Sequence, residues 1–229
     1  MGAFVSVFRA REPPSTEDDT QSRSLPAKPV LRHRSSSTGS TERQTRSSRA
    51  VFVLGPSSSG KTTLCDALVR YLDLDRARYV TEVARAVMRE QGFSRKDVDT
   101  YEMQYAIMTA QLKAEEKVLA HSTGTPDDDG GVILLSDRSA IDPIVYASTS
   151  KNPGAEDMRR RLMRDREFQD ILPLYRKSLF IVLQPVKEWI KDDGHLFATL
   201  EELNIPYVTI GTDLKDLDSR VAFVATFVA

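Results

Sequence analysis

The chain has 229 residues, enough for one sizeable hydrophobic core with an appended segment. Its 32 basic and 33 acidic residues nearly balance, so no overall positive field favours nucleic acid, and we expect no nucleic-acid partner. No apolar stretch approaches the roughly 18 residues of a membrane helix, and a single cysteine, Cys65, excludes an internal disulfide, so the composition predicts a cytoplasmic protein.

Residues 1–49 differ in composition from the rest of the chain. They are rich in Ser, Thr, Pro and Arg and carry a net positive charge, whereas the remainder is net acidic. From about residue 11 to 48 no helical or alternating apolar period is present, so this segment buries too little apolar surface to offset the entropy of ordering. We therefore predict a disordered tail over residues 1–49 and one folded domain over residues 50–229.

The first residues carry a signal of their own. Met1 to Ser6 fits the pattern for N-myristoylation of Gly2. One acyl chain holds a membrane only together with a second feature, and Arg9 and Arg11 are few for that purpose. Two interpretations stay open: peripheral membrane contact through an acylated Gly2, and a start codon followed by an unmodified, frayed tail.

From residue 50 onward, short apolar runs alternate with helical patterns. The runs cover residues 50–54, 132–135, 179–183 and 207–210, and residues 79–80 form a weaker fifth run. Buried parallel strands joined by crossover helices have this pattern. We predict an α/β fold of three layers, in which a mostly parallel five-stranded sheet lies between helices.

The first strand is followed by the strongest functional signal. Residues 55–62 read Gly-Pro-Ser-Ser-Ser-Gly-Lys-Thr, the phosphate-binding loop pattern, and a helical pattern follows at 63–72. The two glycines allow the backbone N–H groups to face phosphate oxygens, and Lys61 adds a positive charge at the β- and γ-phosphates. The loop predicts binding of ATP or GTP by Gly55, Pro56, Ser57, Ser58, Ser59, Gly60, Lys61, Thr62 and Thr63.

Glu82 follows the weak strand at residues 79–80. At the carboxyl end of that strand its carboxylate would open into the phosphate crevice and accept a proton from an attacking hydroxyl, so Glu82 is the candidate general base. The alternative is a glutamate that complements the dipole of the next helix and pairs with Arg85.

A long helix is predicted after Glu82. Ser94 to Asp97 fits a capping box, so we expect the helix to run over about residues 95–121. We expect its apolar face to lie in the core. That face carries Val98, Tyr101, Tyr105, Met108, Leu112 and Leu119.

Asp137 follows the apolar run at 132–135, at the edge of the sheet where the phosphate loop lies. Mg²⁺ prefers oxygen ligands, so Thr62 and Asp137 form a candidate magnesium site. An N-cap of the next helix is the alternative for Asp137, although Ser139 can fill that position. Arg138 is a candidate phosphate contact, with a surface salt bridge as its alternative.

Enzymes that transfer phosphoryl groups commonly close a helical lid that carries arginines over the phosphates to exclude water. Residues 158–166 are the candidate lid, and Arg160 and Arg164 are its candidate phosphate contacts. The alternative is an ordinary solvated helix face with charge pairs four residues apart, such as Glu156 with Arg160.

These segments together resemble the P-loop kinase domain of the NadR-like ribosylnicotinamide kinase family, an AAA-type domain, over about residues 50–228. The resemblance rests on the loop at 55–62 and on Glu-Val-Ala-Arg at 82–85, Asp-Arg-Ser at 137–139 and Asp-Asp-Gly at 192–194. It implies a magnesium- and ATP-dependent kinase that phosphorylates a hydroxyl of a small, ribosylnicotinamide-like acceptor, with Lys61, Glu82, Asp137 and Arg138 as its catalytic residues.

The Asp-Arg-Ser segment, followed by Asp142 and Tyr146, is also similar to the signature of deoxynucleoside and thymidylate kinases. In that wider group a glutamine of the third helix contacts the base. The resemblance therefore implies acceptor contacts by Gln104 or Gln111, and Arg85 is a further candidate.

A second function is also implied by the family. Eukaryotic proteins with the same AAA-type domain include a GTP-binding, phosphoinositide-associated trafficking protein. An arginine commonly follows the Asp-Gly pair in this family, whereas here Gly194 is followed by His195. This departure and the myristoylation pattern favour the alternative, a nucleotide-binding switch with slow hydrolysis that binds a partner or a phosphoinositide.

Overall fold

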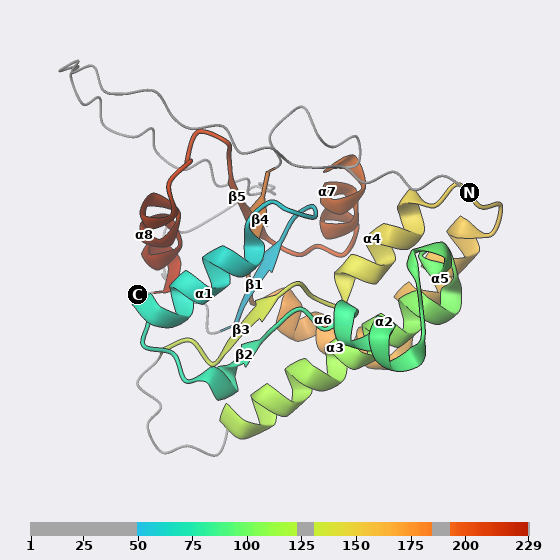
Figure 1. The fold of residues 1–229 in the computed structure, drawn as a ribbon, viewed down its shortest axis with the longest axis horizontal. Coiled ribbons are helices and arrows are strands. Elements are labelled where there is room, and N and C mark those ends of the chain that lie inside the picture. Colours follow the sequence, from blue (N-terminus) through green and yellow to red (C-terminus); the bar gives the residue numbers. More distant parts are fainter. Residues whose placement is uncertain (1–49, 123–130, 185–192, 229) are drawn as a thin grey trace, which may run out of the picture.

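The computed structural model describes residues 50–122, 131–184 and 193–228 of the chain. Five strands form one sheet in the order β2-β3-β1-β4-β5, and every neighbouring pair is parallel (Figure 1). The predicted five-stranded α/β sheet is confirmed and is wholly parallel. The predicted tail and Gly2 lie outside the described residues. The strands are β1 Ala50–Leu54, β2 Tyr79–Val80, β3 Leu134–Asp137, β4 Leu179–Leu183 and β5 Tyr207–Ile210.

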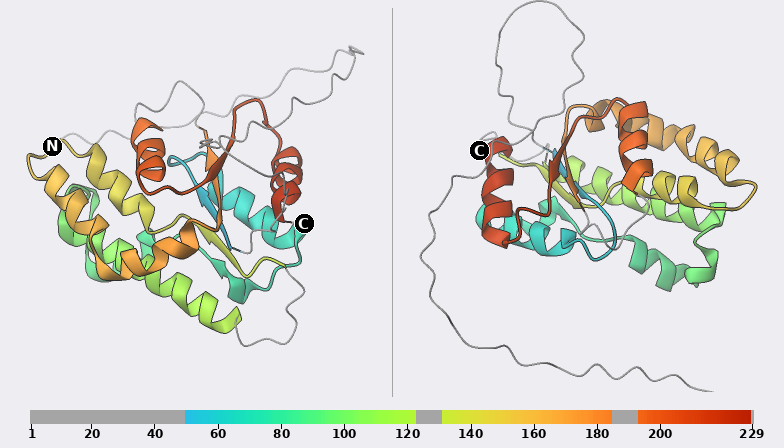
Figure 2. Two further views of the ribbon diagram at one scale, coloured as in Figure 1. Left: turned by 180° about the vertical axis from the view of Figure 1, so that it is seen from behind. Right: turned by 90° about the horizontal axis from the view of Figure 1, so that it is seen from above.

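Helices cover both faces of the sheet. The helices α1 and α8 pack on one face, and α3, α4, α6 and α7 lie over the other (Figures 1 and 2). None of the helices that the structure describes is long and apolar enough to cross a membrane. The helices are α1 Lys61–Tyr71, α2 Ala84–Gln91, α3 Tyr101–Ser122, α4 Ile141–Thr149, α5 Ala155–Met163, α6 Arg166–Tyr175, α7 Asp193–Glu202 and α8 Leu217–Val228, with single 3-10 turns η1 Arg76–Arg78 and η2 Arg95–Asp97.

The central strand β1 supplies both halves of the core. Phe52 and Leu54 belong to the cluster under α3, α4 and α6, whereas Val51 and Val53 belong to the cluster under α1 and α8. Successive side chains of a strand point to opposite faces, so a strand covered on both faces must be apolar throughout. This double burial fixes the carboxyl end of β1, from which the phosphate loop begins.

The third strand lies two residues later in the chain than its apolar run predicts. The run at 132–135 suggests an end at Leu135, but β3 continues because Ser136 pairs with Phe52 and Asp137 pairs with Val53. Backbone pairing does not depend on the side chain, so polar residues extend the strand. As a result Asp137 is held on the sheet beside the end of β1.

The long helix begins later than its capping signal predicts. The capping box is confirmed, since the Asp97 carboxylate accepts a hydrogen bond from the Ser94 N–H at 2.7 Å, but it begins only the turn η2. Thr100 then accepts a hydrogen bond from the Met103 N–H at its hydroxyl oxygen, 3.4 Å, and α3 starts at Tyr101. A capping box marks where a helical turn begins, but it does not determine how long the helix that follows will be.

The predicted apolar face of this helix is correct at Met108 and Leu112 and wrong at Tyr105. The Tyr105 ring is 37% exposed and stacks on Tyr101, whose other neighbour is the Arg161 guanidinium, 3.6 Å from its ring centre. Tyrosine is amphipathic, and stacking and cation–π contacts are available to it at a surface. The periodicity alone therefore misjudged the direction in which this part of α3 faces.

Candidate functional site

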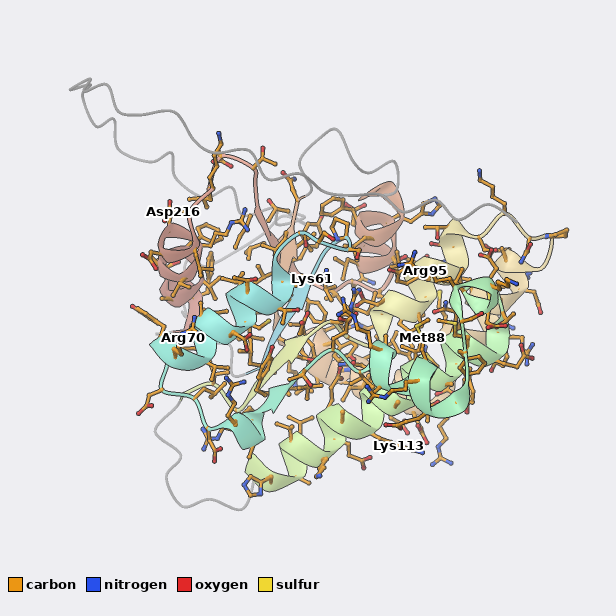
Figure 3. All side chains as sticks on the ribbon, in the orientation of Figure 1. Lys61, Arg70, Met88, Arg95, Lys113 and Asp216 are labelled. Atoms are coloured by element: carbon orange, nitrogen blue, oxygen red, sulfur yellow. The ribbon has the colours of Figure 1, made fainter. Side chains whose placement is uncertain are left out.

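The phosphate loop connects β1 to α1 at the carboxyl end of the sheet. It starts at Gly55, with φ 138°, and ends at Gly60, with φ 90°, both in the region that favours glycine. Beside the loop is a cavity of about 290 Å³, which the first residues of α1 line. Lys61, the first residue of α1, is labelled in Figure 3. The lining residues are Ser57, Ser58, Gly60, Lys61, Thr62, Thr63, Glu82, Arg85, Asp137 and Arg138.

Gly55 is required by close packing as well as by its dihedral angle. A Cβ at this position would lie 2.6 Å from the backbone oxygen of Leu183 in β4, which cannot move without breaking the sheet. We expect Gly55→Ala to destabilise the fold by about 3 kcal/mol through strain and overlap. Chemical denaturation measures this change in the free energy of unfolding.

Gly92 provides the matched control, because its φ is also positive at 74° but nothing lies within 4 Å of an added Cβ. Gly92→Ala should cost only about 1 kcal/mol. Equal losses of stability in the two variants would show that the contact with Leu183 does not constrain the loop.

Lys61 is held against the loop that precedes it. Its side chain is 5% exposed and its Nζ donates a hydrogen bond to the Pro56 carbonyl oxygen at 2.6 Å. Burial lowers the pKa of Lys61, and the neighbouring Arg138 lowers it further, while Asp142 and Asp137 raise it. A buried cation beside a cavity attracts an anion more strongly than one in water, because the surrounding dielectric is low.

Thr62 and Asp137 are brought together from α1 and β3. The Thr62 hydroxyl donates a hydrogen bond to Asp137 Oδ2 at 2.5 Å. Asp137 is 1% exposed, and its Oδ1 is buried with no hydrogen-bond partner among the described residues. Burial raises the pKa of Asp137, whereas the Thr62 hydrogen bond and Lys61 lower it. The open carboxylate oxygen and the hydroxyl are the hard ligands that Mg²⁺ prefers, so the pair fits this ion.

The alternative for Asp137, capping of the next helix, does not occur. The N-cap of α4 is Ala140, and the side chain at this N-cap position makes no capping hydrogen bond. The Ile141 N–H instead donates to the Ser139 hydroxyl at 3.2 Å. Within the described part of the chain, no group of three or more His, Cys, Asp or Glu side chains could hold a metal ion by itself.

Asp137→Asn should increase the Mg²⁺ concentration needed for half-maximal phosphotransfer by about tenfold or more. The amide removes the charge of the candidate ligand but keeps its size. A magnesium titration at saturating nucleotide measures the change. Asp66→Asn is the control, because Asp66 on α1 lies outside the cavity and pairs with Arg76. A magnesium requirement that is the same in both variants would remove Asp137 from the metal site.

Arg138 adopts a strained backbone conformation directly after β3. Its φ is 87°, in the left-handed region that non-glycine residues rarely adopt, and its N–H donates to the Val53 carbonyl oxygen at 3.1 Å. The guanidinium lies 3.0 Å from the Asp142 carboxylate and 3.3 Å from that of Glu82. Strain of this kind persists only where the surroundings impose it and is typical of functional sites. Only 13% of the Arg138 side chain is exposed, so its ion pairs are not ordinary surface salt bridges.

Glu82 lies between β2 and α2, next to two arginines. Its carboxylate is 3.0 Å from Arg85 Nε and 3.3 Å from Arg138 Nε, and its side chain is 20% exposed. The pairing with Arg85, which the alternative interpretation expected, is therefore present. Glu82 precedes the first turn of α2, which begins at Ala84, so it does not lie within that helix. Its assignment as the general base stays a prediction.

A second and larger cavity adjoins the first. Its volume is about 490 Å³, and it shares Ser57, Glu82, Arg85 and Arg138 with the phosphate cavity. All three predicted acceptor contacts, Arg85, Gln104 and Gln111, line it. Its remaining lining residues are Ala84, Met88, Arg95, Val98, Met103, Ile107, Ser139, Asp142, Pro143 and Tyr146, among which Met88 and Arg95 are labelled in Figure 3.

Several residues of this second cavity escaped the sequence analysis. Arg95 looked like part of a helix start, because it follows the capping residue Ser94. Met88 and Ile107 were not singled out in the sequence at all. The signal that was available is the pair Gln104 and Gln111, two polar residues on the buried side of α3. Uncharged polar groups on a buried helix face indicate hydrogen bonding to the interior or to a ligand.

The lid arginines lie away from the phosphate cavity in this structure. Arg160 on α5 pairs with Glu156 at 3.8 Å, and both side chains are exposed. Arg164 caps the end of α5, and neither arginine lines either of the two cavities described here. The solvated pair that the alternative interpretation named is therefore observed, and the lid role of these arginines stays a prediction.

Comparisons with known proteins agree with this architecture. A family model described as an AAA domain matches residues 50–224. The crystal structure of NadR protein in complex with NR is similar with a TM-score of 0.53 and 21% identity, over 81% of this chain and 52% of that one. The chain thus spans about half the length of that NadR structure.

The thymidylate kinase from Ehrlichia chaffeensis is similar with a TM-score of 0.51 and 13% identity, over 78% of this chain and 97% of the enzyme. At these identities the two likenesses show a shared P-loop kinase fold. The comparison with curated proteins gives no match.

Proposed function

The chain belongs to the AAA domain family, and on this premise we propose that it is a P-loop kinase that transfers the γ-phosphate of a nucleoside triphosphate to a hydroxyl of a nucleoside-like acceptor. The observation that carries this proposal is the junction of two cavities, one beside the phosphate loop and one beside α3, at Glu82 and Arg138. Donor and acceptor would meet there. The family resemblance makes ribosylnicotinamide the first acceptor to test, as does the NadR complex with NR.

The phosphate cavity would bind and orient the triphosphate. The backbone N–H groups at the start of α1 and the Lys61 ammonium would face the phosphate oxygens. Thr62 and Asp137 would hold Mg²⁺, which when bound neutralises phosphate charge. Phosphoryl transfer depends chiefly on positioning and charge stabilisation, so this preorganised cavity supplies most of what the reaction needs.

At the junction, Glu82 would accept the proton of the acceptor hydroxyl. The acceptor oxygen forms a bond to the γ-phosphorus, the bond from that phosphorus to the β,γ-bridging oxygen breaks, and the nucleoside diphosphate leaves. Arg85 and Arg138 form ion pairs with the two oxygens of the Glu82 carboxylate, at 3.0 and 3.3 Å, and these charges favour its position between the cavities.

A panel of nucleosides and ribosylnicotinamide, incubated with γ-labelled ATP or GTP and Mg²⁺, tests the proposal. We expect label to appear on at least one acceptor and also expect the Lys61→Ala protein to be inactive in the same preparation, which excludes a contaminating kinase. Absence of transfer to every acceptor, together with tight binding of GTP, would contradict the kinase assignment.

That second outcome is the one expected of a GTP- or ATP-binding switch with slow hydrolysis and partner or phosphoinositide binding. The observation that favours the switch is His195, exposed on α7 at the position where the family commonly has an arginine. Membrane contact through Gly2 would belong to this second function. Flotation of the full-length, acylated chain with phosphoinositide vesicles separates it from the kinase.

A further inference from the structure

A buried carboxylic acid lies directly behind the acceptor cavity. Glu115 on α3 is completely buried, and its two oxygens have different partners. Tyr175 of α6 donates its hydroxyl proton to Glu115 Oε2 at 2.7 Å, and Gln111 Nε2 donates to Glu115 Oε1 at 2.9 Å. The second proton of Gln111 Nε2 goes to the Ser136 hydroxyl oxygen at 3.0 Å.

The phosphotransfer chemistry described above makes no use of Glu115. A buried carboxyl group is costly unless it is hydrogen-bonded, so an apolar residue would serve the core better. Among the partners of Glu115, however, Gln111 lines the acceptor cavity. The carboxyl group is therefore linked to the acceptor through a single side chain.

The amide of Gln111 can face the cavity in two ways. An amide has two N–H donors at one end and one acceptor oxygen at the other. With both donors engaged by Glu115 and Ser136, its Oε1 is left for the acceptor. Turning the amide over would present Nε2 instead, and the hydrogen-bond network decides between the two orientations.

Glu115 determines the orientation of the Gln111 amide, because Glu115 Oε2 already accepts a hydrogen bond from Tyr175. The Tyr175 hydroxyl oxygen already accepts from the Ala140 N–H at 3.2 Å, so its own proton must go to Glu115 Oε2. The state of Oε1 is then decisive. A carboxylate oxygen there can only accept from Gln111 Nε2, whereas a protonated oxygen would donate to Gln111 Oε1 and turn the amide over.

We propose that Glu115 is a positioning residue that sets acceptor specificity: its carboxylate form makes Gln111 present a carbonyl oxygen, which selects a base with an amino or amide N–H over one with a carbonyl group at the same position. This inference rests on the proposed function, since it concerns the acceptor cavity of that kinase. It assigns the acceptor class by its hydrogen-bonding groups.

Gln104 supports the same acceptor class independently. Its Nε2 donates to the Val98 carbonyl oxygen at 2.7 Å, and a carbonyl can only accept, so the amide orientation is fixed. Its Oε1 is buried with no hydrogen-bond partner among the described residues, and Gln104 is one of the residues that line the acceptor cavity. A buried oxygen without a donor is costly and indicates a ligand that supplies one. No titratable group holds Gln104 in this orientation.

The Gln111 amide is expected to turn over at a pH that an assay can cover. Burial raises the pKa of Glu115 to about 8, against the lowering effect of the hydrogen bonds from Gln111 and Tyr175, and the charge of Asp142 adds to the rise. The groups facing Glu115 are Gln111 on its own helix, Tyr175 on α6 and Asp142 on α4. Above this pH the carboxylate form predominates.

Cytidine and its 4-deamino analogue, pyrimidin-2-one riboside, are suitable probes, because they differ only by the amino group and neither ionises between pH 6.5 and 9.5. The measurement is the ratio of their kcat/KM values in competition, from pH 6.5 to 9.5. Groups that act equally on both nucleosides, including Glu82 and Lys61, cancel in this ratio. We expect the wild-type preference for cytidine to rise about tenfold as the pH passes through about 8, the effect of one hydrogen bond.

Glu115→Gln mimics the protonated form permanently. Its amide oxygen accepts from Tyr175, and its N–H group donates to Gln111 Oε1. We expect the variant to keep the low-pH ratio at every pH. A wild-type ratio independent of pH, or a Glu115→Gln ratio that still follows pH, would overturn the inference. Thr199→Val is the control, because this buried threonine of α7 donates its hydroxyl proton to the His195 carbonyl oxygen, lines neither cavity of the site and should keep the wild-type ratio.

Tyr175→Phe keeps the inference testable should Glu115→Gln fail to fold. Loss of the hydrogen bond that favours the charged form raises the pKa of Glu115, so the midpoint of the ratio should move to higher pH. An unchanged midpoint would contradict the proposal. Calorimetry with both nucleosides tests the role of Glu115 separately from the proposed kinase function. Binding and transfer with a kcat/KM ratio that does not depend on pH would refute only the role of Glu115. Absence of binding would refute the proposed kinase as well.

Discussion

Replacing Lys61 with alanine is expected to lower phosphotransfer by about three orders of magnitude and to weaken triphosphate binding. Lys61 is the buried cation of the phosphate cavity, and its Nζ lies 2.6 Å from the Pro56 carbonyl oxygen of the same loop. Removing it takes away the charge that faces the β- and γ-phosphates and leaves that oxygen without its donor. Nucleotide affinity by calorimetry and kcat with a saturating acceptor measure the two parts of the effect.

The control is Lys113→Ala. This lysine lies on the outer side of α3, exposed and away from both cavities of the candidate site (Figure 3). It changes the net charge by the same amount and should leave both quantities unchanged. A Lys61→Ala protein with normal affinity and turnover would contradict the assignment of the loop as the triphosphate site.

Replacing Glu82 with glutamine is expected to lower phosphoryl transfer by about 100-fold while triphosphate affinity changes little. The amide keeps the length of the side chain and can still meet Arg85 and Arg138, but it cannot take up the proton of the acceptor hydroxyl. Because loose phosphoryl transfer relies more on positioning than on a strong base, this loss should be smaller than that of Lys61→Ala. Single-turnover rates with a saturating acceptor measure the chemical step.

Glu90→Gln is the matched control, since Glu90 is an exposed glutamate of the same α2 region outside both cavities. Its single-turnover rate should equal that of the wild type. Should Glu82→Gln also retain the full rate, Glu82 would be only a charge partner of Arg85 and Arg138. That result would favour the alternative interpretation of Glu82, in which it complements the dipole of α2 and pairs with Arg85.

The central strands of this fold were predictable because they are buried on both faces. A doubly covered strand such as β1 or β4 must be apolar throughout, and the resulting run stands out from the amphipathic helices around it. The end of β3 was not predictable in the same way, since Ser136 and Asp137 belong to it through pairing with β1. This pairing between strands that are distant in the sequence cannot be predicted from the local sequence.

The phosphate loop was also predictable, because its chemistry depends on contiguous residues. Gly55, Gly60, Lys61 and Thr62 act through one turn of backbone and the first turn of a helix, so their spacing in the sequence is their spacing in space. The contact between Thr62 and Asp137 was expected only from the rule that parallel strands share a carboxyl edge.

The amino-acid sequence by itself determined the order of strands and helices, the phosphate loop and the candidate magnesium pair. Only the tertiary structure decided that α2, α3 and α4 enclose an acceptor cavity, that Tyr105 faces outward, and that Glu115 holds Gln111 from behind. The physical reason is the distance along the chain over which each kind of interaction acts. Backbone propensity and loop chemistry are set within a few residues, whereas burial and hydrogen-bond partners such as Tyr175 and Glu115 arise only when distant segments pack together.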